Sequence, residues 1–257
     1  MSFRALAEDI ARLAGAVLRD RFSQTRTIET KGGLIANLVT DADRASEELI
    51  LERLKREVPT HAVLAEETGE RGQGDFHWFV DPLDGTTNYA HGVPHFCVTL
   101  ALQDAQGMLL GVTYDPIRDE MFSAGRGEGT TLNGRKVQAT RVTTLDQAIL
   151  ATGFPYDLQE KPDEVLRLFD AFVRKAQGMR RMGSAALDFA YVASGRFDGF
   201  FEFGLKPWDT AAGSILLSEA GGQMRSIDGS PYEPRVGNVI AAGLGLLPAL
   251  LKISANT

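Results

Sequence analysis

A buried strand that ends in an aspartate-rich turn is the strongest constraint on how this chain folds. Trp78, Phe79 and Val80 form an apolar run, and the next residues read Asp81-Pro82-Leu83-Asp84-Gly85. Proline fixes φ and glycine permits a tight backbone, so this sequence ends the strand in a turn. Taken alone, the two aspartates could cap backbone amides of the turn or bind a ligand, and the element leaves both interpretations open.

Further acidic residues stand at comparable places in the chain. Glu66 follows a short apolar strand, Asp209 stands at the expected start of a helix, and Asp43 lies three residues after Thr40. Each has an ordinary alternative: solvation for Glu66, the helix dipole for Asp209 and a capping box for Asp43. Strand ends, however, are where sheets commonly present ligands, and carboxylates gathered there repel one another unless a cation neutralises them. An oxygen-only set suits magnesium or manganese rather than zinc.

The bulk properties exclude several classes of protein. The 257 residues carry a formal net charge of −7, which argues against nucleic acid or an anionic membrane as a partner of the whole surface. The single cysteine, Cys97, cannot form an internal disulfide, so an oxidising compartment is not implied. The N-terminus has the pattern of an amphipathic helix rather than a signal peptide, and no apolar run is long enough to span a bilayer. We therefore expect a cytoplasmic protein.

The first half of the chain reads as two helices and a set of strands. The first helix carries apolar residues at helical spacing, namely Phe3, Leu6, Ile10, Leu13, Val17 and Leu18. Thr40 is a plausible N-cap for a helix that runs to about Val58. Strands are predicted at 63–64, 78–80, 96–102, 108–114 and 120–123, with a polar loop over 66–74 and a hairpin turn at Asn133-Gly134.

The second half alternates strands and helices. Strands are predicted at 148–152, 197–203, 223–227 and 239–242, and helices at 162–176, at 184–194, from Pro207 to about 221, and at the C-terminus. Sheets covered by helices in both halves predict a layered sandwich of mixed α+β and α/β character. A boundary near residues 140–145 is expected, without a linker or an internal repeat.

Five separated segments resemble the inositol monophosphatase family. Trp78 to Asn88 is similar to its first signature, and Phe201 to Gly213 is similar to its second in a form typical of bacterial members. Residues 38–43, 65–68 and 183–186 also match, in the expected order, so the resemblance spans essentially the whole chain. It implies a five-layer α-β-α-β-α sandwich. In this fold residues 1–142 would carry most metal ligands, and residues 143–257 would carry Asp209 and the residues that select the substrate.

The resemblance also implies a cluster of two to three Mg²⁺ ions, with Mn²⁺ as a possible substitute. Glu66, Asp81 and the backbone carbonyl of Leu83 would hold the first ion, and Asp81, Asp84 and Asp209 the second. Glu66 and waters would support a weaker third ion, with Glu67 nearby. Paired metals about 3.5 to 4 Å apart can activate a water and stabilise the leaving oxygen of an in-line displacement.

Roles in catalysis follow from the same resemblance. Thr86, paired with Asp43, would orient and deprotonate the attacking water, while Glu66 and Asp81 act through the metal. The amides of Gly85 and Thr86 would receive phosphate oxygens. The alcohol would contact side chains or backbone at Asp84, Ser184, Ala185, Glu202 and Asp209.

Three of these assignments have open alternatives. Ser184 could simply be an N-cap, and Glu202 an exposed glutamate at a strand end. Lys31, in the loop Lys31-Gly32-Gly33, could approach the phosphate or stay solvated.

The predicted reaction is hydrolysis of a small phosphate monoester, with myo-inositol 1-phosphate as the leading substrate. The resemblance adds inhibition by lithium and a homodimer. Lys206 departs from the histidine of many animal members and leaves the alcohol less certain, so broad-specificity sugar phosphatases, fructose 1,6-bisphosphatase, histidinol phosphatase and a phosphatase of 3'-phosphoadenosine nucleotides are rivals. A different class of function is also open, because bacterial proteins of similar sequence associate with RNA polymerase.

Overall fold

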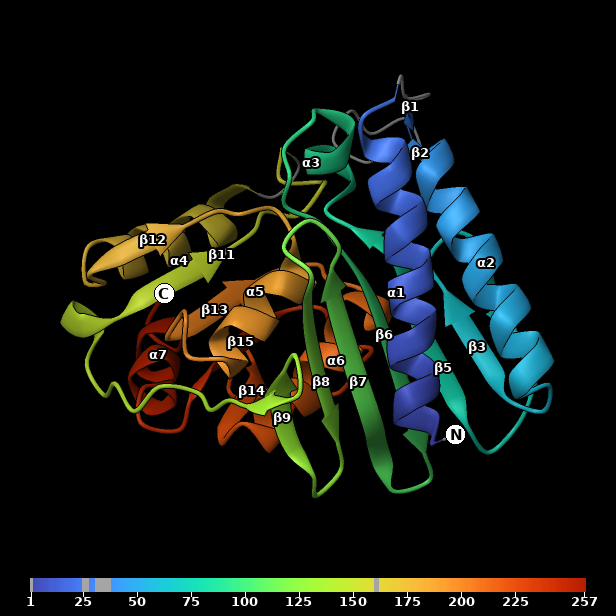
Figure 1. Ribbon diagram of the computed structural model, residues 1–257. Coiled ribbons are helices and arrows are strands. Elements are labelled where there is room, and N and C mark those ends of the chain that lie inside the picture. Colours follow the sequence, from blue (N-terminus) through green and yellow to red (C-terminus); the bar gives the residue numbers. More distant parts are fainter. Residues whose placement is uncertain (1, 25–27, 31–37, 160–161) are drawn as a thin grey trace.

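An eight-stranded, mostly antiparallel sheet dominates the first half of the chain. The computed structural model describes residues 2–24, 28–30, 38–159 and 162–257, and Figure 1 shows the sheet between two groups of helices. Its strand order is β10-β9-β8-β7-β6-β5-β3-β4, and only β3 and β5 pair in parallel. The strands are β3 (Ala62–Ala65), β4 (Gly69–Arg71), β5 (His77–Asp84), β6 (Cys97–Asp104), β7 (Gly107–Asp115), β8 (Glu120–Gly125), β9 (Gly129–Leu132) and β10 (Arg135–Lys136).

A five-stranded mixed sheet follows in the second half. Its order is β12-β11-β13-β15-β14, with β11 parallel to both β12 and β13. The strands are β11 (Ile149–Thr152), β12 (Gly178–Arg180), β13 (Gly199–Glu202), β14 (Gly222–Ser226) and β15 (Val239–Gly243). A separate short ladder joins β1 (Ile28–Thr30) to β2 (Leu38–Thr40).

Helices form the remaining three layers. They are α1 (Phe3–Phe22), α2 (Asp41–Glu57), α3 (Thr86–Ala90), α4 (Pro162–Val173), α5 (Ala185–Ala193), α6 (Pro207–Glu219) and α7 (Leu247–Ser254), with a 3₁₀ turn at Leu145–Gln147. α1 and α2 cover one face of the large sheet, and α5 and α6 lie between the two sheets (Figure 1). α4 and α7 cover the outer face of the small sheet. This arrangement confirms the predicted five-layer α-β-α-β-α sandwich.

The apolar core follows the same layers. One cluster fills the space between the first two helices and the large sheet, and includes Ile10, Trp78 and Val98. A second surrounds α5 and α6 between the sheets, where Phe189 meets Phe200 edge to face. Because α5 is buried all round, its position is determined by both sheets, and this matters for the site.

The first helix buries a different set of residues from the one expected. Ala7, Ala11 and Ala14 are fully buried together with Ile10 and Leu18, whereas Leu13 is 38% exposed. A period of 3.6 residues places these alanines on the stripe that faces the sheet and Leu13 outside it. Small side chains there permit the helix to lie close to β7; a Cβ on Gly15 would come within 2.6 Å of the Tyr114 ring.

Most predicted elements are confirmed to within a few residues, and the errors lie at edges. The segment 66–74 was expected to be a loop but contains β4, which pairs antiparallel with β3. β12 was not predicted, and β13 and α4 are shorter than expected. Three-residue edge strands bury few side chains, so no alternation marks them in the sequence. The large sheet ends at Lys136 and the small one begins at Ile149, while the division at 142/143 stays a prediction.

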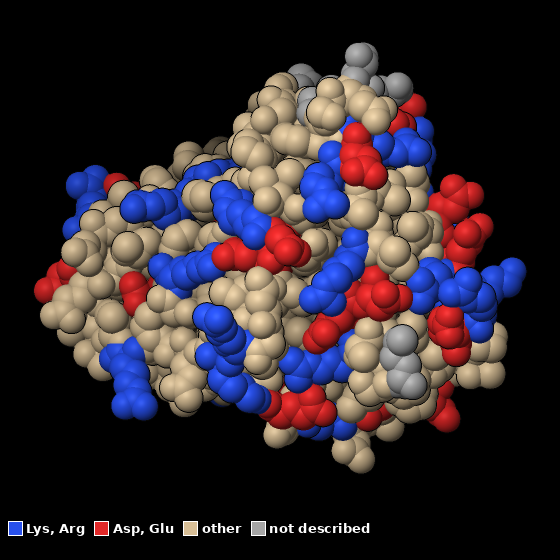
Figure 2. All heavy atoms as spheres, viewed as in Figure 1, with Lys and Arg blue, Asp and Glu red and all other residues tan. Residues whose placement is uncertain are grey.

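Charges of both signs are interspersed on the molecular face shown in Figure 2. Salt bridges of the described residues include Arg126 to Asp104 and Arg196 to Glu120. Within the described ranges, none of the helices combines the length and the apolar character that crossing a bilayer requires.

Candidate functional site

Four acidic side chains from distant parts of the chain line one pocket of about 240 Å³. Its lining consists of Glu66, Asp81, Leu83, Asp84, Gly85, Thr86, Tyr156, Lys206, Trp208 and Asp209. Larger hollows exist, such as one of about 760 Å³ beside α2, but they do not gather the predicted acids. Seven residues of the lining are predicted site residues, so this pocket is the candidate site.

The parallel pair β3 and β5 explains why Glu66 and Asp81 meet. Ala65 is paired with Val80 at the end of the ladder, and the Glu66 amide extends the pairing by donating to the Val80 carbonyl at 3.1 Å. Both acids therefore lie directly after the paired part of β3 and β5, at the same edge of the sheet, where open sheets present ligands.

The segment after Val80 was expected to be a turn, but β5 continues to Asp84 and its irregular end directs the next acids. The Leu83 amide donates to Asp81 Oδ1 at 2.9 Å, and the register of β5 against β6 shifts between Asp81 and Asp84. A shift of this kind re-aims side chains at the end of a strand. Asp81 therefore accepts a backbone amide of this segment and also lines the pocket, so the two interpretations of this aspartate are compatible.

Asp84 is held by the start of α5. Its Oδ2 atom accepts the hydroxyl of Ser184 at 2.5 Å and the amide of Ala186 at 2.8 Å. Gly85 follows with φ of 94°, and a Cβ there would lie 3.1 Å from the His95 carbonyl and 3.2 Å from the Gly183 carbonyl. Only glycine fits this close passage between two loops.

The two carboxylate oxygens of Asp43 accept hydrogen bonds from different partners, Thr40 and Thr86. Its Oδ2 atom accepts the amide and hydroxyl of Thr40 at 2.7 and 2.6 Å, which completes the capping box of α2. Its Oδ1 atom accepts the Thr86 hydroxyl at 3.2 Å, and that hydroxyl also lies 3.0 Å from the Leu83 carbonyl. The structural and functional alternatives for Asp43 are therefore compatible.

Two polar residues on the inward face of α2 were not predicted. Ser46 donates to the Pro82 carbonyl at 2.8 Å, and Glu47 accepts the Glu67 amide at 2.9 Å. They lie three and four residues after Asp43, so one helical face holds both acidic segments. The apolar residues Ala45 and Leu49 of the same helix are only half-buried. A polar i, i+3, i+4 set on a helix face next to an acidic motif is the signal that could have identified Ser46 and Glu47.

Asp209 enters the pocket from the first turn of α6. Pro207 begins the helix, as predicted, and the Lys206 amide donates to Asp209 Oδ2 at 2.6 Å. Thr210, the next residue, accepts the Tyr232 hydroxyl at 2.6 Å. The helix start is thus held from both sides.

Burial and mutual repulsion make the acids of the site difficult to ionise without a cation. Burial raises the pKa of Asp81 well above its ordinary value, and neighbouring carboxylates, led by Glu66, raise it further. Burial and then Asp84 do the same for the pKa of Asp209. Burial also raises the pKa of Asp43 to about 7, against the effect of its bonds from Thr40. A bound cation would reverse this repulsion.

The donor set fits a hard divalent cation. All the candidate ligands are oxygens, as Mg²⁺ and Mn²⁺ prefer. Among the described residues, no three His, Cys, Asp or Glu side chains already stand at the spacing of a formed metal centre. Oδ2 of Asp84 and Oδ2 of Asp209 are instead directed at donors of the protein. The four acids nevertheless line one pocket, and carboxylates that repel one another move together only around a cation.

Of the residues predicted to contact the alcohol, Asp84 and Asp209 line this pocket, whereas Ser184, Ala185 and Glu202 lie outside its lining. Ser184 is 1% exposed, directs its hydroxyl to Asp84 and also caps α5. Ala185 is 8% exposed. Glu202 is half-buried at the end of β13. Lys31 to Gly33 lie outside the described residues.

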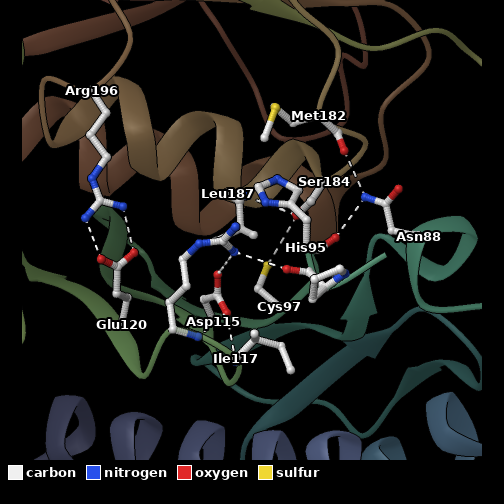
Figure 3. A network of polar contacts seen from close by, with 12 residues as sticks. Asn88, His95, Cys97, Asp115, Ile117, Glu120, Met182, Ser184, Leu187 and Arg196 are labelled. Atoms are coloured by element: carbon white, nitrogen blue, oxygen red, sulfur yellow. Dashed lines mark hydrogen bonds and ion pairs between the residues drawn. The ribbon is translucent and has the colours of Figure 1, made fainter. Parts of the chain in front are cut away.

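Two further residues of the site were missed in the sequence. Tyr156 lines the pocket although its side chain is 53% exposed. Asn88 donates through Nδ2 to the carbonyls of His95 and Met182, both at 2.8 Å, and Figure 3 shows its side chain pointing toward Met182. Asn88 thereby ties the turn to the loop before α5. Only its place inside the first signature could have indicated this, since its partners are 7 and 94 residues away.

Comparisons with known proteins agree with this geometry. An "Inositol-1-monophosphatase" of Synechocystis sp. is 43% identical over 92% of this chain and 83% of its own length. A "Nus factor SuhB" of Pseudomonas aeruginosa is 42% identical over 94% of this chain and 91% of its own length. The crystal structure of the extragenic suppressor protein suhB of Bartonella henselae superposes with a TM-score of 0.92 at 36% identity, over 97% of both chains.

The inositol monophosphatase family model matches residues 2–256, so the match includes both sheets and every part of the pocket. The resemblance first noted in five short segments therefore extends over the whole sandwich, and this chain belongs to the inositol monophosphatase family.

Proposed function

We propose that the protein is a magnesium-dependent phosphatase of small polyol phosphates, with myo-inositol 1-phosphate as the leading substrate. The observation that carries this proposal is the gathering of Glu66, Asp81, Asp84 and Asp209 in one pocket with Thr86. The Synechocystis relative, named as an inositol-1-monophosphatase, supports the same choice of substrate.

Glu66, Asp81, Asp84, Asp209 and the Leu83 carbonyl would hold the metal ions. Bound Mg²⁺ lowers the pKa of its water and neutralises charge on the phosphate. Residues of the protein would supply the remaining steps of the reaction. Thr86, whose hydroxyl lies between Asp43 and the Leu83 carbonyl, would orient the attacking water and accept its proton. Gly85 and Thr86, at the start of α3, line the same pocket, and their amides would receive phosphate oxygens.

The test is phosphate release from a panel of monoesters with and without magnesium. We expect turnover only with a divalent cation and inhibition by lithium. Asp81→Asn should abolish nearly all activity while the protein stays folded, and Asp20→Asn, on the exposed side of α1, is the matched control. If no ester is hydrolysed at millimolar magnesium, the proposal is wrong. Histidinol phosphate, fructose 1,6-bisphosphate and a 3'-phosphoadenosine nucleotide belong in the panel, because these rivals are open.

A second candidate function is binding to the transcription machinery, which the "Nus factor" names of several relatives favour. It is compatible with hydrolysis, and the cytoplasm and a homodimer would suit both functions. A pull-down with an Asp84→Asn variant tests it: specific capture of transcription components supports a role separate from catalysis, and an empty result argues against it.

A further inference from the structure

Gly153 and Glu202 lie side by side where two parallel strands end. β11 and β13 are in register, with Ala151 beside Phe200 and Thr152 beside Phe201. The next pair in this register is Gly153 and Glu202. Side chains of such neighbours leave the same face of a parallel sheet, so the Glu202 side chain leans across a position that has no side chain.

The contact between them is closer than any residue but glycine permits. A Cβ on Gly153 would lie less than 3.0 Å from three atoms of Glu202, its Cδ and both carboxylate oxygens. The three separations are equal, so the flat face of the carboxylate rests on the glycine. Gly153 is buried, while Glu202 keeps part of its surface exposed.

Backbone conformation does not explain the glycine. Gly153 is absent from the set of glycines with positive φ, so alanine could adopt its φ and ψ. The three atoms nearest to a Cβ all belong to the end of a flexible glutamate side chain. Alanine at this position would therefore move the carboxylate rather than the fold.

Other contacts leave Glu202 dependent on this position. Within the described part of the chain the Glu202 carboxylate accepts no hydrogen bond. Burial raises its pKa, and the charge of Arg181 opposes that effect. Arg181 itself lies 6.0 Å from the ring of Phe154, the residue after Gly153. A carboxylate that accepts no hydrogen bond from the protein is held in position by packing.

We infer that Gly153 is a positioning residue, which seats the Glu202 carboxylate so that it can accept hydrogen bonds from a pair of adjacent hydroxyls on the alcohol part of the substrate. This inference rests on the proposed function. It assigns the selection of polyols over simple esters to a glycine that touches no substrate atom. Two adjacent hydroxyls match the two oxygens of a carboxylate held in one orientation.

The test compares myo-inositol 1-phosphate with p-nitrophenyl phosphate, which has no hydroxyl pair. Gly153→Ala should raise KM for the inositol ester about tenfold, the size of one lost charge-assisted bond, with a much smaller rise for the aryl ester. In a Glu202→Ala background, where no carboxylate is left to displace, Gly153→Ala should not change KM any further. Gly178→Ala is the matched control, since this glycine of the same sheet also meets only a flexible side-chain end.

The outcomes separate the two proposals. Equal rises in KM for both esters, or the same rise in the Glu202→Ala background, would overturn the inference and leave the phosphatase function intact. An unchanged KM for Gly153→Ala would do the same. If the unaltered protein hydrolyses neither ester, the proposed function is wrong and the inference falls with it. The melting temperature of Gly153→Ala should stay near that of the unaltered protein, because a glutamate rotamer can change without a cavity or strain.

Discussion

The Ser184 hydroxyl lies 2.5 Å from Asp84 Oδ2 and joins the start of α5 to the acidic turn 100 residues earlier. Figure 3 shows Ser184 beside Cys97, whose thiol lies 3.8 Å from the same carboxylate oxygen. A hydroxyl bound to one oxygen of a carboxylate leaves the other free to bind a cation. We therefore expect Ser184 to support the proposed metal site through Asp84.

We expect Ser184→Ala to weaken magnesium activation about tenfold, because loss of an outer-sphere partner typically lowers metal affinity by this order. The kcat at saturating magnesium should recover most of its value. The measurement is the activity as a function of magnesium concentration. Ser194→Ala, which removes the hydroxyl at the other end of α5, is the control. A change in KM for the alcohol with no change in the magnesium requirement would instead support the direct contact.

Asp43→Asn should reduce kcat about 100-fold, a typical loss when a group that assists proton transfer is removed. An amide cannot accept both the Thr86 hydroxyl on one side and the Thr40 donors on the other. The variant should also cost about 1 kcal/mol of stability through the weakened cap.

Thr40→Ala separates these two effects of Asp43. It should lower the free energy of unfolding by a similar amount while the fall in kcat stays far smaller. Equal losses of activity in Thr40→Ala and Asp43→Asn would mean that Asp43 acts only through the helix cap. Steady-state kinetics and urea unfolding of the two variants are sufficient to decide.

Removal of Asp81 should stabilise the metal-free protein above the ordinary titration range of aspartate. Because burial and neighbouring charges raise the pKa of Asp81 in the folded protein, the metal-free folded state holds protons more tightly than the unfolded state. Its free energy of unfolding therefore falls as pH rises above the ordinary range for aspartate. In EDTA at pH 8, Asp81→Asn should melt at a higher temperature than the unaltered protein.

Magnesium should reverse that order. At about 100 times its Kd, a ligand adds about 2.7 kcal/mol to the stability of a protein that binds it only when folded. The unaltered protein should gain this stability and Asp81→Asn should gain little. Calorimetry with and without magnesium measures both effects, and an equal gain in the two proteins would exclude Asp81 as a ligand.

His95 should make the protein sensitive to mild acid. It is 3% exposed, and in the described part of the chain neither ring nitrogen has a hydrogen-bond partner. Burial first, and then the charge of Arg118, lower its pKa to about 4, while Asp115 acts weakly in the opposite direction. The unfolded state therefore binds a proton at His95 that the folded state does not bind, and the free energy of unfolding decreases as pH falls below about 6.5.

We expect His95→Leu to remove about 2 kcal/mol of the difference in unfolding free energy between pH 7.5 and pH 5. Urea unfolding at the two pH values measures it. The comparison uses differences, so a uniform effect of the substitution on packing cancels. An unchanged pH dependence would mean that His95 is protonated or solvated in the folded protein.

Local chemistry explains why so much was predictable from the sequence. The strand before Asp81, the Thr40 cap and the Pro207 helix start depend on neighbours within a few residues, and all are observed. The turn predicted from Asp81 onward is instead a continuation of β5 to Asp84 with an irregular pairing to β6. The order of strands and helices predicted the layers for the same reason. β4 and β12 escaped prediction because a short edge strand is specified by its partner strand rather than by its own residues.

Contacts between distant segments could not be predicted in this way. The motif placed Asp81 and Asp84 in a turn, but only the packed structure shows that α2 holds one side of it through Ser46 and α5 holds the other through Ser184. Asn88 and Gly153 are further examples, since each acts on an atom far away in the chain.

The sequence by itself therefore determined which residues are acidic, where the strands end and which family the chain resembles. The tertiary structure decided which of these carboxylates share a pocket and which donors orient them. The physical reason is that helix caps and turns are local interactions, whereas a buried carboxylate needs partners that only the closing of two sheets around α5 and α6 brings within hydrogen-bond distance.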